Sequence, residues 1–151
     1  MDEAVKTEVR QYLVFKLGKE EYGVDIQKIT TIIEKDMQIT RVPKSSPFIK
    51  GVINLRGEII PIMDLRKRFS MPAVEDTEDT RIIILKLEEV TIGIIVDAVA
   101  EVVYLTEDAI ENISSFSSDT SLNYILGAGK IENRIITIIH LENLIAADEA
   151  Q

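Results

Sequence analysis

Cysteine is absent from this 151-residue chain, and histidine occurs only once. A chain without cysteine forms neither disulfides nor thiolate metal sites, which fits a reducing compartment. Metal ligation by other donors needs clustered side chains, and one histidine among scattered carboxylates is poor evidence for such a cluster. We therefore expect no metal ion and no other cofactor.

Long apolar runs and an excess of positive charge are lacking as well. No run approaches the roughly 20 apolar residues that a membrane-spanning helix requires. The acidic, polar N-terminus MDEAVKTE does not resemble a secretory signal. The net charge of −9 should repel nucleic-acid phosphates and anionic membranes. We expect a cytoplasmic protein that binds neither nucleic acid nor the membrane directly.

What the chain does have is short β-branched runs separated by turn residues. Ile and Val dominate its apolar residues, which favours strands. Many short strands with frequent turns and few long helices predict an all-β fold with short helices. We predict two small five-stranded β-barrels packed through a shared hydrophobic interface, with a short C-terminal helix over residues 141–147.

The clearest element is the stretch GVINLRGEIIPIMDL, residues 51–65. It predicts a hairpin with a tight turn at Arg56 and Gly57, because glycine adopts φ > 0 without strain. Pro61 cannot donate a ladder hydrogen bond, so its strand should lie at a sheet edge or be bulged there. Asp64 should then cap a short helix.

The same hairpin recurs 76 positions later, where Asn133 corresponds to Gly57. Asn is the other residue that tolerates left-handed turn geometry. Farther upstream, residues 12–25 are echoed by residues 82–97. We interpret these matches as an internal duplication, although two hairpins could also look alike without common origin.

The duplication divides the chain into two predicted halves, residues 9–80 and 81–147. Halves of about 75 residues bury only about 60% of their unfolded surface and are marginal alone. We therefore expect them to share an interface within one domain. Residues 70–80, with proline, acidic residues and few apolar ones, are the best candidate for the linker.

Two aspartates are the strongest catalytic candidates, because Asp25 and Asp97 occupy equivalent positions of the repeat. As the dyad of a small hydrolase their carboxylates would have to lie within about 5–10 Å of each other. As caps of short helical turns they need only local backbone N–H groups, and duplication then explains the pair without chemistry. His140 could be a general base, but a helix-start or surface position suits it better. No serine has a nucleophile-elbow context, and no glycine loop matches a phosphate cradle.

Arg56 is the most interesting single residue, as a cation at a hairpin turn. It is either a recognition anchor, since arginine is enriched at binding hot spots, or an exposed turn residue without a role. Its counterpart is Glu132, so the two copies have diverged in charge here. Phe116 and Leu122, apolar residues of a Ser-rich loop, could contact a partner or pin the loop to the core.

Four motifs together resemble the CheW family of chemotaxis coupling proteins: EYGVDIQKI, PFIKGVINLRGEIIPIMDLRKRF, GIIVDAV and RIITIIHLENL. The resemblance covers about residues 9–147, nearly the whole chain. It implies two five-stranded SH3-like barrels and an adaptor that links chemoreceptors to the histidine kinase CheA. The chain stops after the C-terminal helix, without room for the additional domains of CheA or CheV, which favours the stand-alone coupling protein.

The resemblance also implies two binding faces. The helical hairpin tip of the receptor would dock between the barrels, and the kinase's regulatory domain would pair with the first barrel. Thr31 stands where some members carry an acidic partner for the motif's arginine. The receptor-facing positions are Asp25, Ile26, Ile29, Gly51, Asn54, Leu55 and Arg56. The kinase-facing positions are Leu13, Ile39, Val42, Phe116 and Leu122.

The leading hypothesis is thus an adaptor without catalytic activity, recruited to membrane receptor arrays through its partners. The alternatives are a small hydrolase using Asp25 and Asp97, and a purely structural module that assembles with itself.

Overall fold

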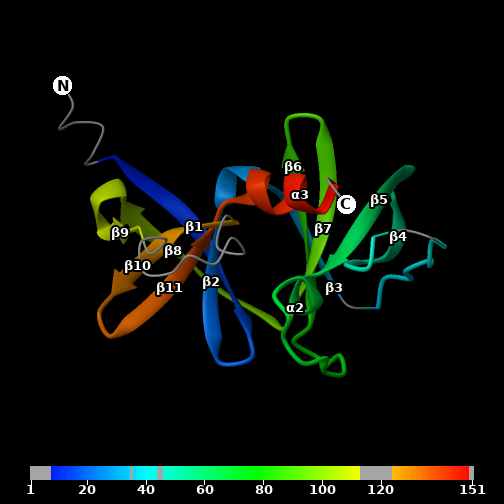
Figure 1. Cartoon of the computed structure of the whole chain (residues 1–151), viewed down its shortest axis with the longest axis horizontal. Coiled ribbons are helices and arrows are strands. Elements are labelled where there is room, and N and C mark those ends of the chain that lie inside the picture. The colour runs from blue at the N-terminus through cyan, green and yellow to red at the C-terminus, as the bar shows by residue number, and fades with distance from the viewer. Residues whose placement is uncertain (1–7, 35, 44–45, 113–123, 150–151) are drawn as a thin grey trace. The chain divides into compact units, whose positions relative to one another are not determined.

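The computed structural model describes residues 8–34, 36–43, 46–112 and 124–149. Strands dominate these residues, and the helices among them are short (Figure 1). The longest, α3 (Leu141–Glu149), has nine residues, and none of the described helices has the length and apolar character to cross a membrane. The predicted all-β class with a short C-terminal helix is confirmed.

The chain forms two compact units, one of which is Lys28–Val99. This unit contains a five-stranded sheet in the order β3-β6-β7-β5-β4. Its ladders are antiparallel except that between β5 and β7, which is parallel. The elements are β3 (Ile29–Glu34), β4 (Ile49–Leu55), β5 (Glu58–Asp64), α2 (Leu65–Arg68), β6 (Arg81–Leu87) and β7 (Val90–Val96).

The other unit combines Met1–Gln27 with Ala100–Ala150. Its sheet has the order β8-β1-β2-β11-β10-β9, and the sixth strand, β9, has only two residues. The strands are β1 (Val9–Leu17), β2 (Glu20–Asp25), β8 (Ala98–Thr106), β9 (Ile110–Glu111), β10 (Ile125–Ile131) and β11 (Arg134–Ile139), with 3₁₀ turns η1 (Ile26–Lys28) and η2 (Glu107–Ala109).

These units do not coincide with the predicted halves 9–80 and 81–147. The hairpin β1–β2 joins the strands of the second half, and β6–β7 joins those of the first. Each exchanged hairpin joins the sheet of the other half by parallel pairing of one strand. These pairs are β2 with β11 and β7 with β5. Residues 70–80 therefore connect α2 with β6 inside one unit, so the expectation that they link the two barrels is wrong.

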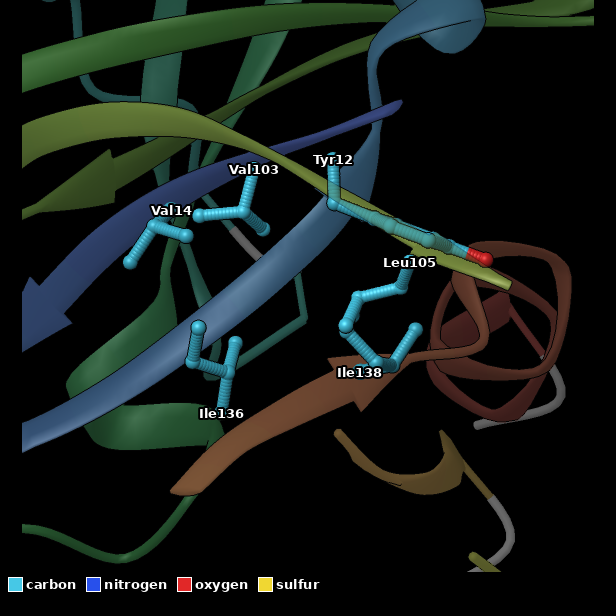
Figure 2. Close-up of a cluster of buried hydrophobic side chains, with 6 residues drawn as sticks. All are labelled: Tyr12, Val14, Val103, Leu105, Ile136 and Ile138. Atoms are coloured by element: carbon cyan, nitrogen blue, oxygen red, sulfur yellow. The ribbon is translucent and has the colours of Figure 1, made fainter. Parts of the chain in front are cut away.

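Each unit has its own apolar core. In the unit that contains β1, side chains from β1, β8 and β11 converge (Figure 2). They are Tyr12, Val14, Val103, Leu105, Ile136 and Ile138, none more than 5% exposed. In the other unit the cluster consists of Ile53, Ile60, Ile62, Ile82 and Ile84, none more than 2% exposed. These clusters account for the runs of Ile and Val seen in the sequence.

Pro61 lies within the sheet, where the sequence predicted an edge strand or a bulge. β5 has β7 on one side and β4 on the other, and the register shift near it falls between Ile49 and Gly51 of β4. Pro61 is opposite Val52, whose N–H and C=O are both bonded to Thr40 on the far side of β4. The pair Val52–Pro61 is thus a non-hydrogen-bonded one, so the missing N–H of Pro61 leaves no bond to β4 unmade, and the ladder between β5 and β7 begins only at Ile62.

Gly51 and its counterpart Gly127 permit the same close backbone approach in both units. A Cβ atom on Gly51 would lie 2.3 Å from the carbonyl oxygen of Thr40, and one on Gly127 would lie 2.5 Å from that of Glu111. Thr40 bridges to β4, and Glu111 of β9 pairs with β10. The two copies therefore share this local structure as well as their sequence, which supports the duplication.

Candidate functional site

The turn between β4 and β5 presents Arg56 to solvent. Arg56 and Gly57 have φ angles of 54° and 85°, as a tight two-residue hairpin turn requires. Asn54 Oδ1 accepts a hydrogen bond from the Gly57 N–H at 3.0 Å, which fixes the turn. Within the described part of the chain, the Arg56 guanidinium forms no ion pair. Its charge is thus available to a partner.

The equivalent turn between β10 and β11 has a different left-handed residue from the one predicted. Among the described non-glycine residues with positive φ, the one in this turn is Glu132, at 54°, and not Asn133. Glu132 is exposed, as Arg56 is. The first residue of each turn therefore has the same φ of 54°, and the two side chains there carry opposite charges.

The seven predicted receptor-facing residues are divided between the units. Leu55 packs partly against the core, and Gly51 is buried. The assembly of these residues into one docking face stays a prediction. Asp25 and Ile26 belong to one unit, and Ile29, Gly51, Asn54, Leu55 and Arg56 belong to the other.

The predicted kinase-facing residues differ in how exposed the structure shows them to be. Leu13 was expected on the surface that faces the kinase, but β1 lies between β8 and β2, and Leu13 is only 6% exposed. Its expected exposure is therefore wrong, because β1 is buried on both faces from Tyr12 to Phe15, whereas a kinase contact there stays a prediction. Phe116 and Leu122 lie outside the described residues.

Ile39 and Val42 do lie at a surface, since both line a groove of about 830 Å³. Val42 is 41% exposed, whereas Ile39 packs partly against the core. The groove also has cationic lining residues, Arg41, Lys50 and Lys67, which the sequence reasoning missed. Basic residues that flank two prolines in an acidic chain could have pointed to Arg41 and Lys50, but only the fold brings Lys67 beside them.

Asp97 forms an ion pair and does not begin a helical turn. Arg66 of α2 donates to both Asp97 carboxylate oxygens, with Nη2–Oδ2 at 2.6 Å and Nε–Oδ1 at 2.9 Å. The hydrogen bond to Asp97 is the main cause that raises the pKa of Arg66. Arg66 Nη1 also donates to the Pro72 carbonyl at 2.7 Å, so one side chain connects α2 with the residue after β7 and with the loop that follows α2 itself. Strand β8 begins directly after Asp97, so the predicted helix-cap role is wrong.

Asp25, in contrast, has the local role that the sequence predicted. Its Oδ1 accepts a hydrogen bond from the Gln27 N–H at 2.9 Å, at the start of η1. Both candidate carboxylates of the hydrolase hypothesis thus have structural partners. Since they lie in different units, no dyad is established.

A second ion network lies on the sheet that contains β11. Arg134 Nη2 donates to Glu21 Oε1 at 2.6 Å, and Nη1 lies 3.2 Å from Glu101 Oε2. The hydrogen bond from Arg134 is the main cause that lowers the pKa of the Glu21 carboxyl. These contacts join β2, β8 and β11 on one sheet.

His140 caps helix α3, which agrees with the predicted helix-start position. Its Nδ1 accepts a hydrogen bond from the Asn143 N–H at 3.2 Å. Asp64, its counterpart in the repeat, accepts from the Lys67 N–H at the start of α2, also at 3.2 Å. Among the residues that the structure describes, no group of three or more His, Asp or Glu side chains is placed to hold a metal ion.

Comparison with known proteins assigns the chain to a family. The family profile described as CheW-like domain matches residues 11–149. Chemotaxis protein CheW of Klebsiella aerogenes is 38% identical over 146 residues, which cover 97% of this chain and 87% of that protein. Chemotaxis protein CheW of Bacillus subtilis is 37% identical over 142 residues, which cover 92% of this chain and 88% of that protein. This chain belongs to the CheW-like family.

A solved CheW structure is similar as well. The scaffolding protein TtCheW from Thermoanaerobacter tengcongensis superimposes with a TM-score of 0.79 at 39% identity, covering 87% of this chain and 89% of that one. The predicted SH3-like class of the two units is thereby confirmed. In this CheW-like chain, Thr31 lies half-buried on β3, and it supplies no carboxylate for Arg56.

Proposed function

We propose that this protein is a chemotaxis adaptor that couples chemoreceptors to the histidine kinase CheA and has no catalytic activity of its own. The observation that carries this proposal is the CheW-like match over residues 11–149, shared with relatives named chemotaxis protein CheW. The description of TtCheW as a scaffolding protein supports it. The hydrolase alternative has no support, because Asp25 and Asp97 each have a structural partner.

Two partners are proposed, each with its own face. The cytoplasmic hairpin tip of a chemoreceptor would dock at the face that includes Arg56, whose charge is unpaired within the described residues. The regulatory domain of CheA would contact the surface at Ile39 and Val42. The protein would act in the cytoplasm and reach the membrane only through its receptors.

The mechanism of such an adaptor is the increase of effective concentration. Binding both partners at once turns the second encounter into an intramolecular one, without any chemical step. A signal relayed through the adaptor is then a difference in its affinity for two states of a partner.

Co-sedimentation with a receptor cytoplasmic fragment and with CheA, separately and together, tests the proposal. Arg56→Glu should weaken receptor binding about tenfold or more, as truncated hot-spot arginines do. Binding to CheA and the thermal melt should stay unchanged. The matched control is Glu132→Arg, which reverses a charge at the same left-handed backbone position of the other hairpin.

Loss of both bindings together with unfolding would assign Arg56 a structural role. No sedimentation of the wild-type chain with either partner would refute the adaptor function itself.

A further inference from the structure

The segment that leads from α2 to β6 is a loop anchored near both of its ends (Figure 1). Near its start, Arg66 Nη1 donates to the Pro72 carbonyl at 2.7 Å. Near its end, the Thr77 N–H donates to Thr80 Oγ1 at 2.9 Å, and the Thr80 N–H donates to the Thr77 carbonyl at 3.2 Å. These contacts hold the loop on either side of residues 73–76.

Residues 73–76, with the sequence AVED, lack such anchors. Within the described part of the chain, none of the four takes part in a hydrogen bond or an ion pair. All four are exposed, Val74 to 55%. Few contacts and an exposed backbone are the features of a segment that shifts at low cost. Because it carries two carboxylates, we refer to residues 73–76 as the acidic strap.

The acidic strap lies beside the groove at Ile39 and Val42, within the same unit of the chain. It lines a small cavity of about 60 Å³ together with Lys50 and Asp64. These two residues also line the groove of about 830 Å³. The strap is therefore next to the groove on the side of Lys50.

The charges of the groove are complementary to those of the strap. Lys50 is one of three exposed cations in the groove lining that form no ion pair within the described ranges. The three are Arg41, Lys50 and Lys67. We refer to this surface as the basic groove. Of the three, Lys50 is the one that also lines the cavity of the strap.

The carboxylates of the small cavity that lie outside the strap are already bonded. Asp64 Oδ1 accepts from a backbone N–H as the cap of α2, and both oxygens of Asp97 accept from Arg66. Glu75 and Asp76 have no such partner among the described residues. They are the carboxylates beside Lys50 that remain available to its ammonium group.

We propose that the acidic strap closes over the Lys50 side of the basic groove and competes there with the regulatory domain of CheA. In the closed form a strap carboxylate pairs with Lys50, while the anchors at Pro72 and Thr77 stay in place. The closure needs no partner, whereas the identity of the competitor rests on the proposed function. The device is an autoinhibitory contact that salt weakens.

Ion pairs between exposed side chains are weak, so the open form should make up roughly one half to one fifth of the molecules. The apparent affinity for a partner falls in proportion to this fraction. Removing the charges of the strap should therefore strengthen kinase binding about two- to fivefold.

Titration calorimetry of the full-length chain with the purified CheA regulatory domain, at about 0.05 M and 0.5 M salt, tests the competition. The strap variant is Glu75→Gln with Asp76→Asn. The matched control is Glu78→Gln with Asp79→Asn, which removes the same charge from the same loop but not from the cavity lining. The strap variant should bind about two- to fivefold more tightly than the control at low salt, and equally at high salt. Equal affinities at low salt would overturn the inference and leave the adaptor function intact.

The absence of cysteine allows the closed form to be trapped by one disulfide. Lys50→Cys is combined with Glu75→Cys or with Asp76→Cys, and circular dichroism verifies the fold. The oxidised form should bind the kinase domain at least about tenfold more weakly than the same variant after reduction. If neither disulfide forms, the strap does not reach Lys50, and the inference is wrong.

Nuclear magnetic resonance of the free chain tests closure without any partner. The amide resonances of Lys50 and Val74 should shift between the two salt concentrations in the wild type and in the control, and less in the strap variant. Salt responses that are equal in all three would overturn the closure. A wild-type chain that does not bind the kinase domain would refute the proposed kinase coupling and the competition, and these resonances would still decide whether the strap closes.

Discussion

Replacing Gly51 by alanine should destabilise the unit Lys28–Val99 through a clash with the chain backbone. The added Cβ would lie 2.3 Å from the Thr40 carbonyl oxygen and 2.8 Å from Ile39 Cγ2. A carbonyl oxygen cannot rotate away as a side chain can, so the bridge between Thr40 and Val52 would have to separate.

The magnitude follows from two contributions. Overpacking costs about 1–3 kcal/mol, and each of the two Thr40–Val52 hydrogen bonds contributes about 0.5–1.5 kcal/mol. The expected loss is therefore about 2–6 kcal/mol of unfolding free energy. At about 2–4 °C per kcal/mol, the melting temperature should fall by roughly 4–24 °C.

Two further glycines provide controls in urea and thermal unfolding followed by circular dichroism. Gly57→Ala meets no atom within 4 Å and has only the strain of φ 85°, about 1–2 kcal/mol. Gly127→Ala should lose as much as Gly51→Ala, because its Cβ would lie 2.5 Å from the Glu111 carbonyl oxygen. A wild-type melting temperature for Gly51→Ala, or a larger loss at Gly57 than at Gly51, would refute the reasoning.

Three ion-pair and capping contacts give further predictions. Asp97→Ala should lower the unfolding free energy by about 1.5–3 kcal/mol, because it removes a charged hydrogen-bond partner from the partly buried Arg66; an unchanged urea midpoint would contradict this. Because the pKa of Glu21 is lowered in the folded state, its pair with Arg134 stabilises the protein above the ordinary Glu pKa and is lost as pH falls through the lowered one. Urea unfolding between pH 3 and 7 should accordingly show a weaker acid dependence for Glu21→Gln, and identical pH profiles would argue against the linkage. His140→Ala should lower the unfolding free energy by about 0.5–2 kcal/mol, and His140→Asn should not, because asparagine retains a capping acceptor and alanine does not. Equal melting temperatures of the two variants would exclude the cap.

Hairpins and their recurrence were predictable from the sequence, but the pairing of the hairpins was not. Alternating apolar residues and Gly57 predict β4, β5 and their turn, because these patterns act over a few residues. The choice of β11 over β5 as the neighbour of β2 depends on long-range packing. Since β5 and β11 are equivalent copies, local sequence is consistent with either choice.

The site was partly predictable for similar reasons. Arg56 was expected at an exposed turn, because a tight turn places its residues at the surface. Leu13 was named from the family resemblance, which does not show that β1 is buried on both faces. The basic groove needs Arg41, Lys50 and Lys67 from three separate segments, and only the folded chain brings them together.

The exchange of hairpins between the copies affects how such a protein can be inherited. A break at the midpoint of the gene would leave β1 and β2 on one product and β8 to β11 on the other, so neither fragment would encode a complete sheet. Neither copy could therefore complete its sheet without the hairpin of the other. The strands of the two copies thus depend on each other, whereas their exposed turns, with Arg56 in one and Glu132 in the other, belong to no shared sheet position.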